Sequence, residues 1–252
     1  MVDSREATKL MEAAKAFRPR ILAERDHIEA GRRLPEELTL ELARAGFFRV
    51  FLPAVYGGLD LTPKAASEVF EELARADASV AWCVWNGNAH WTTARWAREV
   101  AKTVFVDPDT IVANSTRPSG RAEIAEGGYR VSGRWSLVSG CQLSAWFILL
   151  CAVHENGKPR LDPSGVPELR FMLCPATDCD IVDTWTVGGL RGTGSHDVVV
   201  QDRFVPAPYA SFHGCPSPDN HGEPGAVPAF SGMASAQTQR RVFSQLNRSD
   251  PV

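Results

Sequence analysis

The sequence lacks the features of membrane, secreted and nucleic-acid-binding proteins. No apolar run is long enough to cross a bilayer, and residues 145–153 have only the length of a buried strand. The N-terminal stretch MVDSREATKL carries charges and no apolar core, so no secretory signal is expected. The formal net charge is −3 and no basic block occurs, which argues against nucleic acid and anionic membrane as partners. We therefore expect a cytoplasmic protein.

Cysteine is present, but not in an arrangement typical of metal sites. Three of the six cysteines lie in apolar runs, where a thiol behaves as a small hydrophobic group. Cys174 and Cys179 are separated by four residues, whereas zinc ligands come in closer pairs. We expect no metal site, and no disulfide in a reducing compartment.

The spacing of apolar residues changes near residue 111. Residues 7–104 follow helical spacing, and the residues after 111 alternate with period two. The predicted strands are 111–116, 129–138, 145–153, 168–174, 179–182 and 196–205. Helices followed by strands predict an α+β protein with segregated layers. We divide the chain into a helical domain at 1–106, a β domain at 107–213 and an irregular tail at 214–252.

The stretch from Tyr129 to Leu150 reads as a strand, a short polar platform and a second strand. Trp135, Ser136 and Ser139 bring an indole and two hydroxyls near Gly140, a residue that lets a ligand approach the backbone. This surface would suit a flat aromatic ligand edged with hydrogen-bonding groups, such as a flavin. A structural hairpin with exposed serines is the alternative.

The predicted helix at 78–90, capped by Asp77, carries an unusual number of polar and indole groups. They are Trp82, Trp85, Asn86, Asn88, His90 and Trp91. Such groups need a partner when they are buried. Alternatively, the indoles pack on a sheet and the amides face solvent. His90 could bond a phenol or a flavin oxygen, although a lone helical histidine is more often structural.

Two short motifs near residue 190 are similar to the sequence patterns of known functional sites. Gly188 to Gly194, GGLRGTG, lacks the glycine spacing and following helix of a dinucleotide fingerprint. It reads as a tight loop before a strand, or as a loop that sets Arg191 and backbone amides against an anion. Ser195, His196 and Asp197 are the three residue types of a hydrolase triad. Neighbouring residues in a strand point to opposite faces, so these three side chains cannot converge on one another.

Four ordered segments together resemble the acyl-CoA dehydrogenase superfamily. They are residues 32–58, ADASVAW at 76–82, YRVSGRWSLVSGC at 129–141 and GLRGTGSHDVVVQDRFVP at 189–206. Their order implies an N-terminal helical domain followed by a β-barrel-like middle domain. Within the superfamily, the chain looks most like the oxygenase components of two-component flavin monooxygenases, the hydroxyphenylacetate and hydroxy-secosteroid hydroxylases. The segments that indicate this are SGRWSLVSGC, GLRGTGS and, at 114–124, NSTRPSGRAEI. Acyl-CoA dehydrogenases usually carry Thr-Glu-Pro and then Gly-Ser-Asp there, and dehydrogenase activity remains the alternative.

This resemblance implies FAD or FMN, supplied in reduced form by a separate reductase, and an aromatic substrate that is hydroxylated with O2. The implied flavin contacts are Trp82, Asn114, Ser115, Thr116, Leu137, Val138 and Ser139. The hydroxyls of Thr116 and Ser139 would bond the pyrimidine edge or N5 of the ring. His90 would face the substrate pocket, as the implied catalytic residue.

Family members continue into a C-terminal four-helix bundle that covers one side of the flavin and builds a tetramer. Residues 215–252 do not resemble that bundle. The third interpretation is therefore a truncated, inactive remnant or one half of a split enzyme. On this basis we expect the chain alone to bind flavin weakly.

Overall fold

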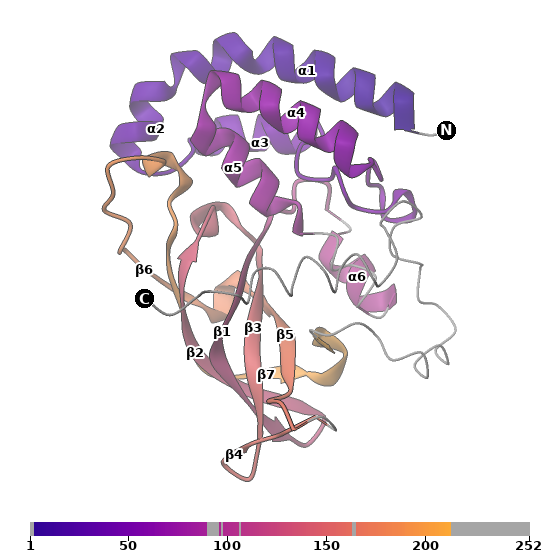
Figure 1. Ribbon diagram of the computed structural model, residues 1–252, viewed down its shortest axis with the longest axis vertical. Helices are drawn as coiled ribbons and strands as arrows, with labels where there is room; N and C mark the ends of the chain where they lie inside the picture. Colours follow the sequence, from indigo (N-terminus) through magenta and orange to yellow (C-terminus); the bar gives the residue numbers. More distant parts are fainter. Residues whose placement is uncertain (1–2, 90–95, 97, 106, 163–164, 213–252) are drawn as a thin grey trace.

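The computed structural model describes residues 3–89, 96, 98–105, 107–162 and 165–212. Helices α1 to α5 gather at one end of the molecule, and the strands extend away from them as one sheet (Figure 1). The predicted α+β class is therefore confirmed. The predicted tail at 214–252 lies outside the described residues. Within the described residues, no helix is both long and apolar enough to cross a membrane.

The helices begin where local chemistry predicts. They are α1 (Asp3–Ala23), α2 (Arg25–Gly31), α3 (Glu36–Arg44), α4 (Pro63–Ala76), α5 (Ala78–Gly87) and α6 (Arg98–Phe105), with short 3-10 turns η1 (Ala54–Tyr56), η3 (Cys141–Leu143), η4 (Ala176–Asp178), η5 (Arg191–Thr193) and η6 (Ala207–Tyr209). The Thr62 hydroxyl accepts from the Ala65 N–H, and Pro63 is the first residue of α4. The Asp77 carboxylate accepts from the N–H groups of Ser79 and Val80 and so fixes the start of α5.

One mixed sheet holds all the described strands. They are β1 (Val112–Ala125), β2 (Gly128–Val138), β3 (Trp146–Glu155), β4 (Lys158–Pro159), β5 (Leu169–Pro175), β6 (Asp180–Val182), β7 (His196–Pro206) and β8 (Ala210–Phe212). Their order is β6-β7-β2-β1-β3-β5-β8, with β4 beside β3 and only β1 and β3 parallel. The outermost strands β6 and β8 do not pair within the described part of the chain. The sheet is thus not a closed barrel, which corrects the barrel-like architecture implied by the resemblance.

Strand β1 is longer than predicted, because it continues past residue 116 to Ala125. Its pairing with β3 shifts register between Ser115 and Gly120. Such an irregularity lets a strand bend and continue beyond a break in its pattern. The period-two pattern stops at Arg117 and Pro118, so the sequence alone did not reveal the second half of the strand.

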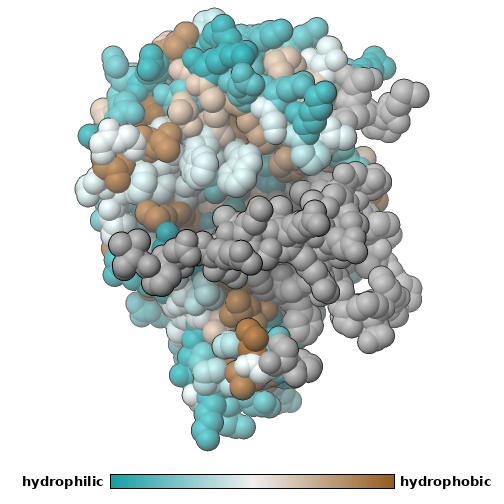
Figure 2. All heavy atoms as spheres, viewed as in Figure 1, coloured by the Kyte–Doolittle hydropathy of each residue, from teal (hydrophilic) through white to brown (hydrophobic). Residues whose placement is uncertain are grey.

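Strand β3 is buried on both faces, as its continuous apolar run predicts. One face packs with α6, through Ile148 and Leu150. The other face joins a core that includes Trp135, Phe147 and Leu149. Figure 2 shows that the outer surface of the helical layer is mostly hydrophilic, with apolar patches lower down over the sheet.

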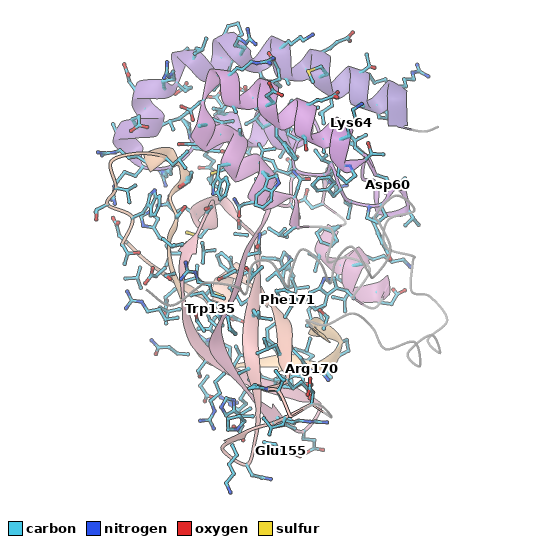
Figure 3. The ribbon with its side chains drawn as sticks, in the orientation of Figure 1. Asp60, Lys64, Trp135, Glu155, Arg170 and Phe171 are labelled. Carbon is cyan, nitrogen blue, oxygen red and sulfur yellow. The ribbon has the colours of Figure 1, made fainter. Side chains whose placement is uncertain are left out.

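Trp135 lies inside the sheet core and not at a ligand surface, which corrects the expectation from sequence. Its indole is fully buried among the strands (Figure 3), and its N–H donates to the Leu150 carbonyl at 2.8 Å. The ring lies over two glycines: a Cβ on Gly120 would come 2.0 Å from Trp135 Cζ2, and one on Gly133 would come 2.8 Å from Cη2. The glycines make room for the indole. This is a tertiary contact, and the alternation of residues along a strand does not predict it.

Candidate functional site

Strands β1 and β2 separate before they reach the helical layer. Their pairing runs from Ala125 opposite Gly128 to Gly120 opposite Gly133 and goes no further. Beyond it, β1 pairs with β3, and β2 pairs with β7. We call the two diverging segments, residues 112–119 of β1 and 134–138 of β2, the β-fork. Backbone groups on its inner edges have no partner in β1–β2 pairing, so they are suited to a ligand with polar edges.

Helix α5 presents two indoles beside the β-fork. Trp82 and Trp85 are 44% and 50% exposed, and their rings stack with centroids 5.3 Å apart. The Trp82 N–H donates to Ser139 Oγ at 2.9 Å, one residue past the end of β2. A second bond, from Asn114 Nδ2 to the Asn86 carbonyl at 3.0 Å, ties β1 to the same helix. The two bonds fix α5 against both arms of the fork.

Leu137 adds a third exposed apolar group on the β2 arm. Its side chain is 49% exposed, and its backbone has a φ of 61°, a left-handed conformation that a leucine rarely adopts. Such strained residues often accompany binding sites, where the surrounding structure over-determines the backbone. Trp82, Trp85 and Leu137 therefore offer a broad apolar surface at the fork.

The other predicted contacts lie along the two arms. Val138 is fully buried, so only its backbone can meet a ligand, and Ser115 is buried with its hydroxyl accepting from the Arg117 N–H at 3.4 Å. Thr116 is exposed on the β1 arm. The structure thus brings Trp82, Asn114 and Ser139 together around the fork. The predicted catalytic residue, His90, lies outside the described residues.

Ser139 is the first member of a chain of hydroxyl groups. Ser139 Oγ lies 2.7 Å from Ser195 Oγ, and Ser195 Oγ lies 2.7 Å from Thr193 Oγ1. The Thr193 hydroxyl donates to the Leu190 carbonyl at 2.9 Å. The sequence contains Thr193 and Ser195 within the GTGS motif, but offers no signal that they lie beside Ser139, more than fifty residues away.

The loop that carries Thr193 is held from three sides. The Gly140 N–H donates to the Thr193 carbonyl at 2.8 Å, and Arg191 Nε donates to the Glu29 carbonyl of α2 at 3.2 Å. At Gly192 an added Cβ would lie 2.0 Å from Ile28 Cγ2, so only glycine fits. These contacts support the interpretation of GGLRGTG as a tight loop before a strand. Arg191 is already engaged by α2.

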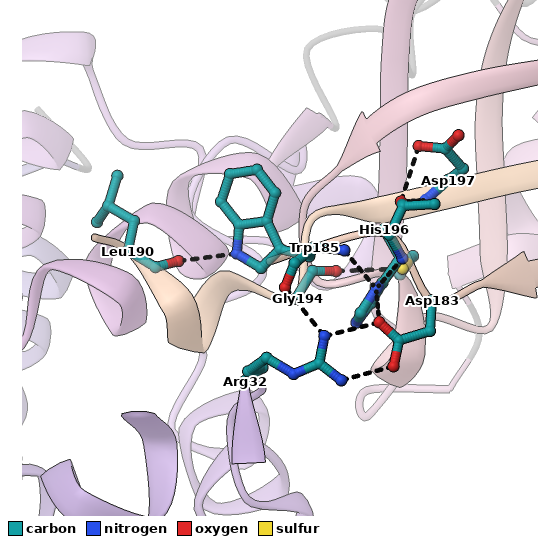
Figure 4. A network of polar contacts seen from close by, with 9 residues as sticks. Arg32, Asp183, Trp185, Leu190, Gly194, His196 and Asp197 are labelled. Atoms are coloured by element: carbon teal, nitrogen blue, oxygen red, sulfur yellow. Dashed lines mark hydrogen bonds and ion pairs between the residues drawn. The ribbon is translucent and has the colours of Figure 1, made fainter. Parts of the chain in front are cut away.

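A polar network next to this loop surrounds His196 (Figure 4). His196 Nδ1 accepts from the backbone N–H groups of Thr184 and Trp185 at 3.2 and 3.3 Å. It also lies 3.3 Å from Asp183, which pairs with Arg32, the residue that follows α2. His196 Nε2 is buried without a hydrogen-bond partner among the described residues. Burial lowers the pKa of His196, and the neighbouring Asp183 only partly opposes this effect.

The run Ser195-His196-Asp197 forms no triad, as predicted from strand geometry. Ser195 bonds to Ser139 and Thr193, and His196 bonds to backbone groups. The Asp197 carboxylate accepts from Arg134 Nε at 2.6 Å and from the Thr184 hydroxyl at 3.0 Å. The three side chains thus do not bond to one another, and among the described residues no nucleophilic side chain is hydrogen-bonded to this imidazole.

Comparison with known proteins gives matches in sequence and structure. Residues 4–108 match the family described as acyl-CoA dehydrogenase, N-terminal domain. The chain is 33% identical over 198 residues to the flavin-dependent monooxygenase, oxygenase subunit HsaA, of Rhodococcus jostii, a match covering 78% of this chain and 50% of HsaA. It is 35% identical over 180 residues to the FADH(2)-dependent resorcinol hydroxylase, oxygenase component, of a Rhizobium species, covering 71% of this chain and 42% of that protein.

Two solved structures share the fold. The HsaA monooxygenase from M. tuberculosis superimposes with a TM-score of 0.76 at 32% identity, over 82% of this chain and 53% of that one. XiaF from Streptomyces, in complex with FADH2 and glycerol, superimposes with a TM-score of 0.74 at 30% identity, over 82% and 51%. The chain spans about half the length of the relatives it matches. Residues 4–108 therefore form an acyl-CoA dehydrogenase N-terminal domain, and the chain is a homologue of the oxygenase subunits of flavin-dependent monooxygenases.

Proposed function

We propose that this chain belongs to the oxygenase component of a two-component flavin-dependent monooxygenase, which hydroxylates an aromatic substrate. The β-fork is the observation that carries this proposal. An isoalloxazine ring has apolar faces and a hydrogen-bonding edge. The fork and α5 beside it offer exposed indoles, strand edges that lie outside the β1–β2 pairing, and the Ser139 hydroxyl. A separate reductase would supply the reduced flavin, which is FAD or FMN.

The residues present fit such a ring. Backbone groups of 114–116 and 137–139 would flank it from the two arms of the fork. Trp82, fixed by its bond to Ser139, would cover part of one face, and Thr116 would bond the pyrimidine edge. When bound, the reduced flavin supplies the electrons that activate O2. The protein's contribution is to orient the ring and the substrate and to exclude water.

The substrate class follows from the relatives. Two of them are named for action on aromatic compounds: the resorcinol hydroxylase and an indole-3-acetate monooxygenase of Acinetobacter baumannii, which is 31% identical over 183 residues. We therefore place an aromatic ring, and most simply a phenol, in the space that His90 is expected to face.

The test compares oxygenation with dehydrogenation. The chain is mixed anaerobically with reduced FAD and resorcinol or indole-3-acetate, and ¹⁸O2 is then admitted. We expect one ¹⁸O atom in the hydroxylated product. Reduction of bound oxidised FAD by an acyl-CoA, without ¹⁸O transfer, would instead show a dehydrogenase. Binding of reduced FAD without either reaction would support the third interpretation, a remnant or one half of a split enzyme.

A further inference from the structure

We propose that Cys174 and Cys179 form a peroxide-sensitive dithiol, which closes to a disulfide and is reopened by thiol reductants. The two residues lie between the end of β5 and the start of β6, and both are free thiols in the structure. Their chemistry does not depend on flavin binding. The pair is therefore a modification site beyond the proposed function.

A short turn brings the two side chains to the same core. Cys174 of β5 belongs to the buried core of the sheet. Pro175 then begins the 3-10 turn η4, and the Cys179 N–H ends that turn by donating to the Ala176 carbonyl at 3.1 Å. The Ala176 N–H donates to the Ala145 carbonyl at 2.9 Å, which fixes the turn beside the start of β3. The Cys179 side chain consequently packs against the core that contains Cys174.

The two sulfur atoms interact directly. Cys179 Sγ lies 3.5 Å from the carbonyl oxygen of Pro175, the residue that follows Cys174. A hydrogen bond between the two thiols, together with burial, raises the pKa of Cys174 well above its ordinary value. Cys174 therefore keeps its proton and directs it toward the Cys179 sulfur.

The two thiols differ in their exposure to an oxidant. Cys174 is only 1% exposed, whereas Cys179 is half-buried, so a peroxide arriving from solvent meets Cys179 first. The other described cysteines are all buried, and burial raises the pKa of each thiol; they are Cys83, Cys141 and Cys151. Buried thiols of this kind are unreactive, because the thiolate is the nucleophile.

Cys151 cannot replace Cys179 as the partner of Cys174. In the pairing of β3 with β5, Cys174 is opposite Phe147, and Cys151 is opposite Arg170, four positions further along the strands. Four residues of a strand span about 13 Å. A disulfide joins residues whose Cα atoms are no more than about 7 Å apart. The fold thus leaves Cys179 as the resolving partner of Cys174 among the described cysteines.

The oxidation takes place in two balanced steps. The Cys179 sulfur attacks one oxygen of hydrogen peroxide, so that the O–O bond breaks, an S–O bond forms, and the thiol proton leaves with the other oxygen as water. The Cys174 sulfur then attacks the sulfur of this sulfenic acid: an S–S bond forms, the S–O bond breaks, and the departing hydroxide takes the Cys174 proton as water. The two thiols lose two electrons, and one peroxide becomes two waters. A thiol reductant reverses the reaction by exchange.

The experiment follows both thiols in one tryptic peptide. The folded full-length chain is treated with a small excess of hydrogen peroxide and without flavin, then denatured, blocked with iodoacetamide and digested. Residues 171–191 contain Cys174 and Cys179 with no lysine or arginine between them. We expect this peptide to lose two hydrogen atoms and escape alkylation in most chains, and to be alkylated twice when dithiothreitol precedes the block. Residues 135–160 contain Cys141 and Cys151 and should be alkylated twice throughout.

Single variants test the order of the two steps. Cys174→Ala removes the second step, so the sulfenic acid on Cys179 should persist and its labelling by dimedone should rise about fivefold or more above wild type. Cys179→Ala should leave Cys174 as an unmodified thiol under the same treatment. Cys151→Ala is the matched control, because it removes an equally buried thiol from the same core. It should leave formation of the disulfide unchanged.

Three outcomes would overturn the proposal. Alkylation of both cysteines in residues 171–191 of the peroxide-treated wild-type chain, or conversion of Cys179 to a sulfinic acid without a disulfide, would refute the dithiol. Equal loss of free thiols in residues 135–160 would show that the oxidation is not specific to this pair. Oxidation of Cys174 in Cys179→Ala would contradict the assigned order, and this variant decides the order even if Cys174→Ala does not fold.

Discussion

Gly120 shows how one residue without a side chain determines the sheet core. An added Cβ would lie 2.0 Å from Trp135 Cζ2 and 2.6 Å from Cys151 Sγ, and the indole is fully buried. We expect Gly120→Ala to lower the free energy of unfolding by about 1–3 kcal/mol, the usual cost of overpacking. Urea denaturation followed by tryptophan fluorescence measures it.

Gly188→Ala is the matched control for this prediction. A Cβ there meets nothing within 4 Å, and the backbone is not left-handed. Its effect should stay within about 0.5 kcal/mol, as for other open surface positions. Equal unfolding midpoints for the two variants would contradict the packing of Trp135 on Gly120.

His196 makes stability depend on pH. Its Nδ1 already accepts two backbone N–H groups, and burial lowers its pKa below the ordinary value. The unfolded chain therefore binds a proton that the folded chain does not, and stability falls as pH drops below about 6.5. Comparing urea midpoints at pH 8 and pH 5.5, we expect a larger loss in wild type than in His196→Gln. The same loss in both proteins would rule out this role.

At the residue scale, the structure brings some of the predicted site residues together and places others apart. Trp82 and Ser139 were both predicted, and the structure joins them by a hydrogen bond. Trp135 was expected at the ligand surface and is buried, because burial depends on Gly120 of another strand. From sequence, Ser195 was considered only as a member of a hydrolase triad, and that triad was rejected. Its contact with Ser139 was not predicted, because the two residues are far apart in the sequence.

Helix α5 depends on its N-cap. The Asp77 carboxylate accepts from the Ser79 and Val80 N–H groups at 2.8 and 3.1 Å. Asp77→Ala should therefore cost about 1 kcal/mol of stability, and Asp77→Ser should recover most of it. Thermal or urea unfolding of both variants measures the difference. If the serine variant were as unstable as the alanine variant, side-chain capping would not explain the effect.

At the element scale, local signals predicted the helix starts but not the β-fork. Thr62, Pro63 and Asp77 act on backbone groups within three residues, so the sequence contains the whole interaction. The fork arises because β1 and β2 stop pairing at Gly120 and Gly133. Strand pairing joins distant segments, and no local period indicates where it ends.

At the scale of the whole molecule, the helical layer and the sheet both contribute residues to the candidate site. Trp82 comes from a helix, Ser139 from the end of β2, and Ser195 from the loop before β7. The sequence predicted a helical layer and a β layer, and their order along the chain. It did not predict an open sheet, because closure of a barrel depends on whether β6 and β8 meet.

The most direct test of the β-fork as the flavin site is an anaerobic titration with reduced FAD of two matched variants. Leu137 at the fork and Leu161 beyond β4 are both exposed leucines, at 49% and 55%. We expect saturable binding of one reduced FAD by the wild-type chain, at least tenfold weaker binding by Leu137→Glu, and unchanged binding by Leu161→Glu. Equal binding by both variants, or no saturable binding by the wild-type chain, would contradict the placement of the flavin in the β-fork.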